Sequence, residues 1–412
     1  MTTQTKGLLD PDVIKCPYAF YDELRKEQPI SYRPELNGYF VASYEFVKLI
    51  LTDGRFRKAA SQNDGRKFIV PDKAAQAVLL EDADIGLPLH CLSESYGTRH
   101  RDFRKIVEPH IGPKGSKQKE AELQACADEL LDKIGGAETC DLVSEFSMPY
   151  TINVMSDAIG FPRSMYQQVK DYAAAALTYL VYKVPEEEAV AGARTMVAMH
   201  KVVREMARER RANPKNDLLT ALATGTVEGR PLTDREICYT IEELVTGGND
   251  TTANAINGGL LYLAQTPDLQ AKLRADPSQT PAFVEEAIRL FPPIQSAHRI
   301  AMEDVEFGGF TIKAGIKVYL GTSSANRDPG KFSCPEEFNM GRPDLNQHVA
   351  FGGGTHFCAG AHLTRVEQRV AYDEWLKRYS SIELAQPVES IEYISTFSSR
   401  TPVSIQLRMR RS

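Results

Sequence analysis

The amino-acid sequence predicts a mainly α-helical protein with small β-sheets. Residues 117–225 are mostly helical in pattern, with breaks near glycines and prolines. Apolar residues recur at helical spacing again from Ile237 onward. Two other stretches, Tyr39–Val41 and Val305–Leu320, have the aromatic or alternating pattern of strands. Since no linker, charge block or repeat divides the chain, we expect a single domain over 1–412, β-rich at about 28–60 and 295–320.

The N-terminal part should contain a helix, two short strands and a second helix. Tyr18 to Glu27 has helical spacing, and Ser43 can cap the helix that carries Val47 and Ile50. Residues 58–96 show no sustained period, apart from a turn of helix within 66–80. We therefore expect a surface loop that ends in an apolar stretch, residues 85–90, which glycine and proline interrupt.

The helices of the middle region have clear start signals. Three glutamates follow Pro185 and place acids in a first turn, as the helix dipole prefers. Thr233 and Glu236 form a capping box that opens the next helix. Further on, Val305–Leu320 should form a hairpin around two glycines, and a final long helix should run from Ala359 to about Trp375.

The helix that opens at Thr233 contains an unusual run, Gly247–Thr252, which reads G-G-N-D-T-T. Each mid-helix glycine costs about 0.5–1 kcal/mol relative to alanine. Asparagine, aspartate and threonine also compete with the helix for backbone hydrogen bonds. The run therefore indicates either a close helix crossing that needs small residues or a groove that faces a ligand.

Composition excludes several classes of protein. The chain has 42% hydrophobic and 25% charged residues, an ordinary globular profile, and its net charge of −6 argues against a nucleic-acid surface. The N-terminus lacks a signal-peptide core, and the run 172–182 is too short to span a bilayer. Seven cysteines without a C-x-x-C pair fit a reducing compartment and give no zinc or iron–sulfur site. We expect a cytoplasmic protein that binds neither nucleic acid nor membrane.

The stretch Phe351–Gly360, F-G-G-G-T-H-F-C-A-G, carries the strongest chemical signal. Glycines let a flat ligand approach the backbone, and the helix start after Cys358 favours a thiolate over a thiol. A thiolate in such a loop can be the axial ligand of a haem iron. The alternative is that Cys358 is a small buried hydrophobe.

Two further pairs of residues occur at helical spacing. His100 and Arg104 lie four residues apart on one helix face, where they suit two carboxylates or form part of a solvated basic helix. Glu286 and Arg289 are three apart and could be an ordinary exposed pair, which would contribute little.

Together these motifs resemble the cytochrome P-450 family. Its haem-binding pattern, F-x-x-G-x-H/R-x-C-x-G, is filled by Phe351, Gly354, His356, Cys358 and Gly360. The family's A/G-G-x-D/E-T-T pattern covers Gly247–Thr252, with glycine where alanine is usual, and its E-x-x-R covers Glu286–Arg289. The three motifs occur in the family's order and spacing, so the resemblance extends over nearly the whole chain.

The resemblance implies a role for each candidate residue. Cys358 would be the iron ligand, Asp250 the catalytic acid and Thr251 the catalytic alcohol. Glu286, Arg289 and Arg342 would form a buried structural ion pair. The residues expected to contact haem are His100, Arg104, Gly248, Arg299, Phe351, Gly354, His356 and Gly360. The candidate substrate-pocket residues are Leu87, Leu89, His90, Leu244, Val245, Gly247, Ile294, Ala297 and Phe397, and Gln295 could orient a polar group.

The resemblance also implies the fold and the activity. The expected fold is that of the family, with haem b (iron protoporphyrin IX) between the long central helix and the cysteine-loop helix. The reaction would insert one oxygen atom of O2 into a C–H bond of a small hydrophobic compound, a terpenoid or an aromatic being preferred. The alternatives are a haem-thiolate peroxygenase, an atypical oxidation such as desaturation or coupling, and a non-catalytic haem sensor.

The electron supply follows from the same resemblance. The chain has no room for a flavin or nicotinamide fold, so we expect no fused reductase. A separate iron–sulfur ferredoxin with its flavin reductase would supply electrons to a monomeric enzyme. Arg101 and Lys105, which lie off the face of His100, could form a positive docking surface for it.

Overall fold

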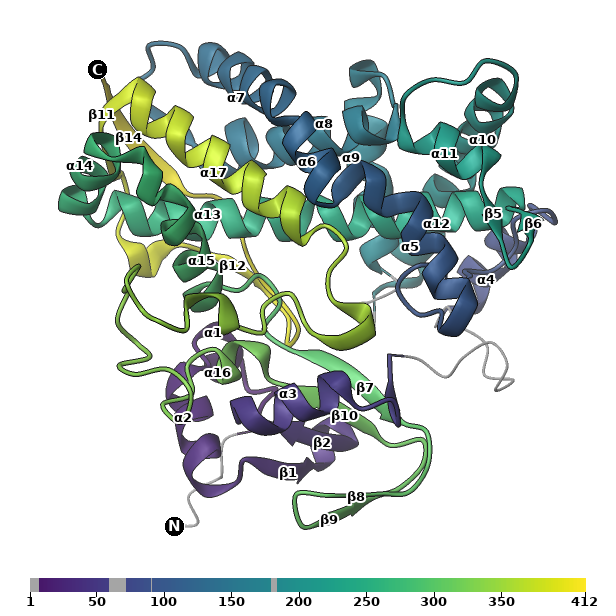
Figure 1. The fold of residues 1–412 in the computed structure, drawn as a ribbon, viewed down its shortest axis with the longest axis horizontal. Coiled ribbons are helices and arrows are strands. Elements are labelled where there is room, and N and C mark those ends of the chain that lie inside the picture. Colours follow the sequence, from purple (N-terminus) through teal and green to yellow (C-terminus); the bar gives the residue numbers. More distant parts are fainter. Residues whose placement is uncertain (1–6, 59–71, 90, 179–183) are drawn as a thin grey trace.

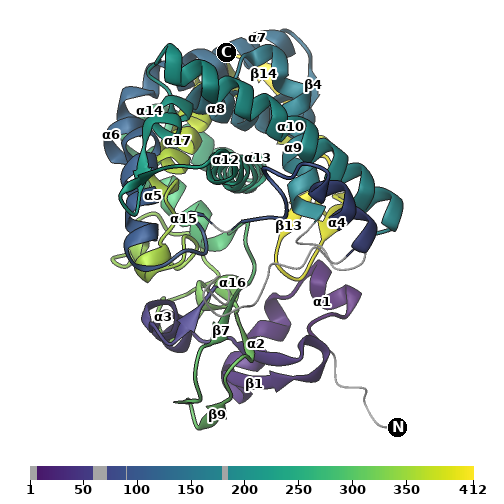
Figure 2. The same ribbon diagram turned by 90° about the vertical axis from the view of Figure 1, so that its right-hand side faces the viewer.

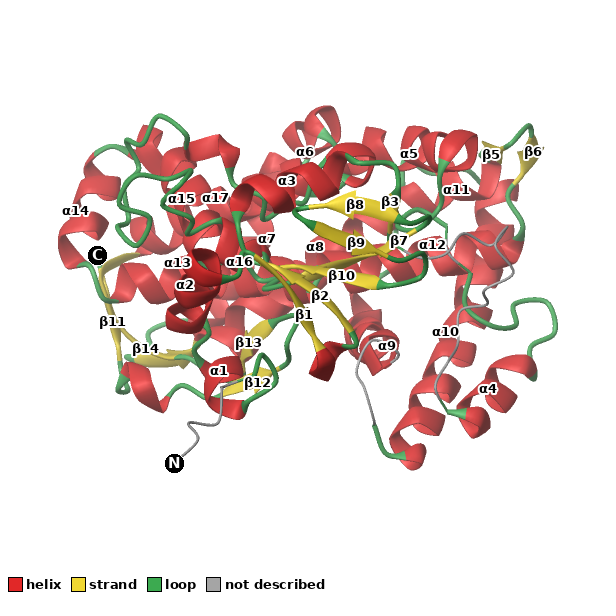
Figure 3. Ribbon diagram, turned by 90° about the horizontal axis from the view of Figure 1, so that it is seen from below, coloured by secondary structure: helices red, strands yellow, loops and turns green. Residues whose placement is uncertain are grey.

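The computed structural model describes residues 7–58, 72–89, 91–178 and 184–412. It consists of a large helical part and a smaller part built on a twisted sheet, with the N-terminal helices beside that sheet (Figure 1). Seen from below, the strands of this sheet lie in front of the surrounding helices (Figure 3). The predicted fold class, mainly α-helical with small sheets, is confirmed.

The helices of the chain are α1 Pro11–Lys15, α2 Tyr18–Glu27, α3 Tyr44–Thr52, α4 Lys73–Leu80, α5 Gly97–Ile111, α6 Pro113–Gln118, α7 Glu120–Ile134, α8 Met148–Ile159, α9 Tyr166–Thr178, α10 Glu186–Ala212, α11 Leu218–Thr224, α12 Asp234–Gly248, α13 Asp250–Ala264, α14 Pro267–Ala275, α15 Thr280–Leu290, α16 Thr322–Ala325 and α17 Ala361–Arg378. Their ends near glycine and proline follow the predicted breaks: α7 ends before Gly135, whose φ is +64°, and α10 begins after Pro185.

The strands of the chain are β1 Ile30–Arg33, β2 Gly38–Val41, β3 Phe56–Arg57, β4 Thr139–Asp141, β5 Thr226–Val227, β6 Arg230–Pro231, β7 Ala297–Ala301, β8 Val305–Phe307, β9 Phe310–Ile312, β10 Lys317–Leu320, β11 Tyr379–Leu384, β12 Tyr393–Ser395, β13 Arg400–Pro402 and β14 Gln406–Arg411. The main sheet has the order β1-β2-β10-β7-β3, and β11, β14 and β4 form a second sheet. The predicted hairpin is shorter than expected, because it contains only β8 and β9, whereas β10 joins the main sheet beside β2 and β7.

The central helix is divided in two. The capping box of Thr233 and Glu236 opens α12 as predicted. At Asn249 the backbone breaks before α13 continues in nearly the same direction, and Figure 2 looks along both helices. Helices α8, α15 and α17 pack around this pair, so the Gly247–Thr252 run lies at the middle of the helical part.

Helix α3, beside the main sheet, is capped from far along the chain. Ser43 occupies the N-cap position of α3, but its hydroxyl makes no capping bond, contrary to expectation. The Asp328 carboxylate instead accepts from the Tyr44 N–H at 2.7 Å. This bond ties α3 to the segment that leads toward the cysteine loop.

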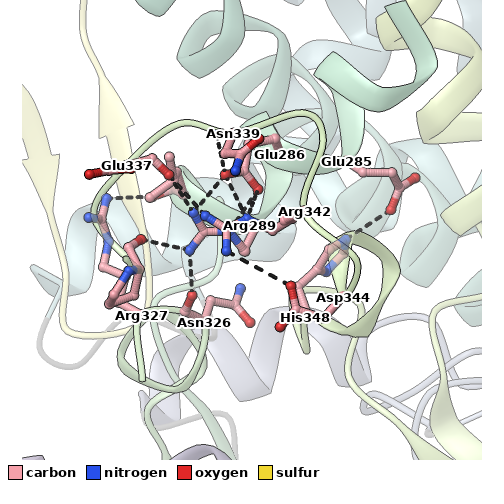
Figure 4. A network of polar contacts seen from close by, with 12 residues as sticks. Glu285, Glu286, Arg289, Asn326, Arg327, Glu337, Asn339, Arg342, Asp344 and His348 are labelled. Atoms are coloured by element: carbon pink, nitrogen blue, oxygen red, sulfur yellow. Dashed lines mark hydrogen bonds and ion pairs between the residues drawn. The ribbon is translucent and has the colours of Figure 1, made fainter. Parts of the chain in front are cut away.

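A buried ion network anchors that segment on α15 (Figure 4). Glu286 and Arg289, neither of which has any exposed side-chain surface, form two hydrogen bonds of 2.8 Å. Arg342 donates to the same carboxylate at 3.0 Å, and so does the Asn339 N–H at 2.8 Å. Arg289 also donates to the Asn326 carbonyl at 2.8 Å. The structure therefore joins the three predicted partners and uses them to hold residues 326–342.

A second acid on α15 binds residues on both sides of the cysteine loop. Glu285 accepts from His348 at 3.0 Å and also pairs with Arg365. Burial opposes its ionisation, but these two partners lower its pKa to about 2. Arg365 in turn lies over the Phe351 ring, 4.5 Å from its centroid.

Candidate active site

At one position of the cysteine loop, the backbone conformation and a close contact allow only glycine. Gly352 and Gly354 have φ values of +72° and +64°. A Cβ at Gly354 would lie 2.5 Å from the Leu51 carbonyl oxygen, whereas one at Gly352 would meet nothing closer than 3.9 Å. The Cys358 N–H donates to the Phe351 carbonyl at 3.0 Å and closes the loop. Gly354 therefore sets how closely the loop approaches α3.

Cys358 lies just before the last long helix and is exposed to solvent. Helix α17 begins at Ala361 with Gly360 as its N-cap, two residues later than expected. Burial raises the pKa of the Cys358 thiol, while the Gly360 N–H and the charges of Lys58, Arg104 and Arg365 act to lower it. The side chain is nevertheless reached by solvent.

Basic side chains form a rim beside Cys358. The His100 and His356 rings lie 4.5 Å apart, and Arg104 donates to the Phe357 carbonyl at 2.9 Å. Burial, followed by the charges of Lys58, His100, Arg299 and Arg104, lowers the pKa of His356 to about 3. The structure thus brings together four of the residues predicted to contact a cofactor.

Lys58 and Tyr96 join this cluster, although sequence analysis did not select either. The Lys58 backbone N–H donates to the Tyr96 hydroxyl at 2.7 Å, and the Tyr96 ring lies 4.6 Å from that of His356. Burial lowers the pKa of the Lys58 ammonium, and neighbouring Arg299 lowers it further. These residues lie in a stretch without periodicity, so no pattern marked them.

The cluster has more positive charge than the protein offsets. Arg299 is 4% exposed and donates to the His298 carbonyl at 2.8 Å; among the described residues, no carboxylate lies within ion-pairing distance of it. In the described ranges, His356 Nε2 is likewise buried without a hydrogen-bond partner. A dianion such as the two propionates of a haem would supply the missing acceptors. The residues present therefore fit that group.

The central helix has an open face at the Gly247–Thr252 run. A Cβ at Gly247 would meet nothing within 4 Å, whereas one at Gly248 would lie 2.8 Å from Met155. Thr251 Oγ1 donates to the Gly247 carbonyl at 2.6 Å. Burial raises the pKa of the neighbouring Asp250 carboxyl. One face of the run is therefore clear for a ligand and carries an acid and an alcohol.

The substrate-pocket candidates fall into different places. Leu87 and Leu89 are half-buried against the helical core, and His90 lies outside the described residues. Ile294 and Ala297 are half-buried beside and in β7. Other candidates are packed away: Leu244 and Val245 are 6% and 0% exposed in the core, Phe397 packs on the Phe40 and Tyr319 rings, and Gln295 donates to the Pro292 carbonyl.

The metal chemistry of the site depends on one residue. Within the described ranges no three His, Cys, Asp or Glu side chains group in a way that could hold a metal ion. Cys358 could therefore hold iron only if a prosthetic group supplied the other ligands. A search of the same residues also finds no helix with the length and hydropathy needed to cross a bilayer.

Comparison with known proteins gives one consistent result. The family model described as cytochrome P-450 matches residues 89–407. The chain is 33% identical over 393 residues to nocardicin C N-oxygenase of Nocardia uniformis subsp. tsuyamanensis, covering 93% of this chain and 94% of that protein. It is 28% identical over 385 residues to linalool 8-monooxygenase of Pseudomonas putida, covering 92% and 93%. The structure matches P450BioI in complex with an acyl carrier protein ligated to hexadec-9Z-enoic acid, with a TM-score of 0.84, 28% identity and coverage of 97% and 99%.

The loop geometry predicts a large difference between two glycine substitutions. Gly354→Ala should lower the free energy of unfolding by about 3 kcal/mol, because a strained φ adds to a clash with the Leu51 carbonyl. Gly352→Ala should lower it by about 1 kcal/mol, since only the φ is unfavourable. Urea unfolding of both variants measures the two values, and equal losses would contradict the close approach.

Proposed function

This chain belongs to the cytochrome P-450 family, and on that premise we propose that it is a haem b monooxygenase that inserts one oxygen atom of O2 into a C–H bond of a small hydrophobic compound. One observation carries the proposal: Cys358 lies beside basic side chains, and one of that cluster, the buried Arg299, has no carboxylate partner among the described residues. That arrangement suits a flat dianionic cofactor with a thiolate ligand. We further propose that residues 1–412 act as one domain.

The chain's own residues would hold the cofactor on two sides. Cys358 would supply its thiolate ligand, and the open face at Gly247 would border it, whereas Gly248, predicted to contact haem, faces Met155. His100, His356, Arg299 and Lys58 would hold the propionates, with Arg104 fixing the loop through the Phe357 carbonyl. When bound, a thiolate-ligated haem supplies the activation of O2.

The acid–alcohol pair would handle protons. Burial raises the pKa of the Asp250 carboxyl, so it holds a proton nearer neutral pH than an exposed aspartate does. Thr251 donates its own hydrogen to the Gly247 carbonyl, which leaves the Oγ1 lone pairs free to accept a hydrogen bond. We propose that protons pass from Asp250 toward Thr251 Oγ1. A sensor without turnover would not need this pair.

For the substrate, we propose a terpenoid or a small aromatic compound. Leu87, Leu89, Ile294 and Ala297 are half-buried apolar residues. The name of the relative from Pseudomonas putida indicates that a similar chain oxidises linalool. Other relatives are named for different compounds, so the preference rests on these four side chains.

For the electrons, we propose an iron–sulfur ferredoxin with its flavin reductase. Arg101 and Lys105 are exposed on α5, the helix that also bonds the cysteine loop through Arg104. They could attract an acidic partner close to Cys358. We also propose that the protein works as a cytoplasmic monomer, because its seven cysteines are all unpaired thiols.

The proposed ligand is tested by the absorption spectrum of the dithionite-reduced protein under carbon monoxide. We expect the long-wavelength Soret band after which the family is named. Cys358→Ser should abolish this band, whereas Cys334→Ser, at an exposed cysteine, should leave it unchanged. Protein that is folded and binds no haem would refute the proposed function.

The proton role predicts a loss of coupling. Asp250→Asn should reduce product formation on the order of 10²-fold while electrons are diverted to hydrogen peroxide, because the amide cannot deliver a proton. The substrate for this assay is the compound that gives the largest spectral shift in a terpenoid and aromatic panel. Asp268→Asn, at an exposed aspartate on α14, is the control. Unchanged peroxide yield in Asp250→Asn would exclude the role.

The docking surface predicts a charge effect on reduction. Replacing Arg101 and Lys105 together by glutamate should slow reduction by a bacterial ferredoxin at least about 10-fold at low salt. Lys201→Glu, at an exposed position on α10, should have little effect. Stopped-flow measurement of the reduced carbon monoxide complex gives both rates. Equal rates in the two variants would place docking elsewhere.

A further inference from the structure

Two short segments that precede α5 are bonded to α12. Arg235 donates to the Leu87 carbonyl at 2.5 Å, and the Tyr239 hydroxyl donates to the Gly86 carbonyl at 2.7 Å. Further along the helix, residues 91–93 meet Glu243. The half-buried Leu87 and Leu89 lie between these attachments. Side chains of α12 therefore hold residues 86–87 and 91–93 in place.

Glu243 accepts four hydrogen bonds from three consecutive residues. Its Oε2 accepts from the Leu92 N–H at 2.7 Å and the Ser93 N–H at 3.2 Å. Its Oε1 accepts from the Ser93 hydroxyl at 2.8 Å and the Cys91 N–H at 3.3 Å. A carboxylate has two oxygens and about four acceptor sites. Residues 91–93 therefore use all of its acceptor sites, and none remains for a cationic group of a substrate.

Glu243 lies on the same face of the central helix as two residues of the Gly247–Thr252 run. Glu243 lies one turn before Gly247 and two turns before Thr251, on the same face as both. That face is open at Gly247. Residues 91–93 are thus held at this face, about one turn from its opening at Gly247. Chain that continues from Ser93 reaches Tyr96 and His100, which belong to the cationic rim.

A neighbouring acid shows that this arrangement is specific to Glu243. Glu242 lies 3.6 Å from the Nε2 of His200 on α10, and so points toward the helix on the other side. Both are glutamates in the same turn of α12, but only Glu243 accepts from residues 91–93. Glu242 therefore provides a matched comparison.

We propose that Glu243 is a positioning residue that fixes residues 91–93 as the ceiling of the substrate pocket and thereby limits the size of the compounds that enter. The inference rests on the proposed function in placing substrate at the open face of α12. It assigns Glu243 a part in selecting substrates, and no contact with the reacting atoms.

The first test is hydrogen–deuterium exchange of the haem-loaded protein. Glu243→Gln keeps the size of the side chain but replaces one acceptor oxygen by an NH2 group that faces N–H donors. We expect the amides of residues 91–93 to exchange at least about 10-fold faster, which corresponds to about 1.4 kcal/mol. Glu242→Gln should leave these amides unchanged. Exchange at the wild-type rate in Glu243→Gln would overturn the proposal.

The second test measures selection by size with two azole probes, imidazole and 4-phenylimidazole, followed by their spectral shifts. Glu243→Gln should change the ratio of the two dissociation constants at least about 3-fold, in favour of the larger azole, because the ceiling yields. Glu242→Gln should keep the wild-type ratio. A ratio that is unchanged in Glu243→Gln, or changed equally in Glu242→Gln, would reduce the contact to a structural one and overturn the proposal.

A milder variant covers the case in which Glu243→Gln does not fold. Ser93→Ala removes one of the four donors and should raise exchange at 91–93 about 2- to 3-fold. Exchange as in wild type would then overturn the proposal. The carbon monoxide spectrum of the wild type distinguishes failure of the proposed function from failure of this inference. A missing Soret band would refute the proposed function, whereas the exchange measurement tests the contact of Glu243 with residues 91–93 in either case.

Discussion

A carboxylate with no exposed side-chain surface, Glu286, governs the geometry of the cysteine side of the protein. Burying it with Arg289 and Arg342 removes several charges from water, a cost that ion pairing alone does not always recover. The remaining donors of Arg289 are used by backbone carbonyls, among them those of Asn326 and Pro335. The ion network therefore folds an irregular segment that has little secondary structure of its own. It fixes the path from β10 to Cys358 together with the contacts of Asp328 and Glu285.

Charged side chains at the site also differ in whether they have an ion-pair partner. Arg365 connects the acid Glu285 with the Phe351 ring, so α15 supports the cysteine loop through two adjacent glutamates. On the rim, by contrast, Arg299 is buried without a carboxylate near it in the described chain. Charges that are paired hold the loop, and charges that are left over face the ligand. The presence of an ion-pair partner therefore distinguishes structural residues from binding residues better than the residue type does.

Much of this architecture was predictable from local signals. The capping box at Thr233, the glycine at helix ends and the motif around Cys358 each depend on a few neighbouring residues, and each was placed within about two residues. Contacts between distant segments were not predictable. Ser43 was expected to cap α3, yet Asp328 does so, and Val245 was expected in the pocket, yet it packs in the core. Lys58 and Glu243 act through tertiary contacts that no spacing in the sequence reveals.

The capping of α3 by Asp328 has a consequence for how the chain is made. The two partners are 284 residues apart, and β2 pairs in parallel with β10, which is almost as distant in sequence. The first elements to leave a ribosome therefore lack their neighbours until most of the chain has been synthesised. Such distant pairing slows folding and leaves an unpaired strand edge open to other chains. The N-terminal sheet is the part of the molecule that would gain most from protection by a chaperone during synthesis.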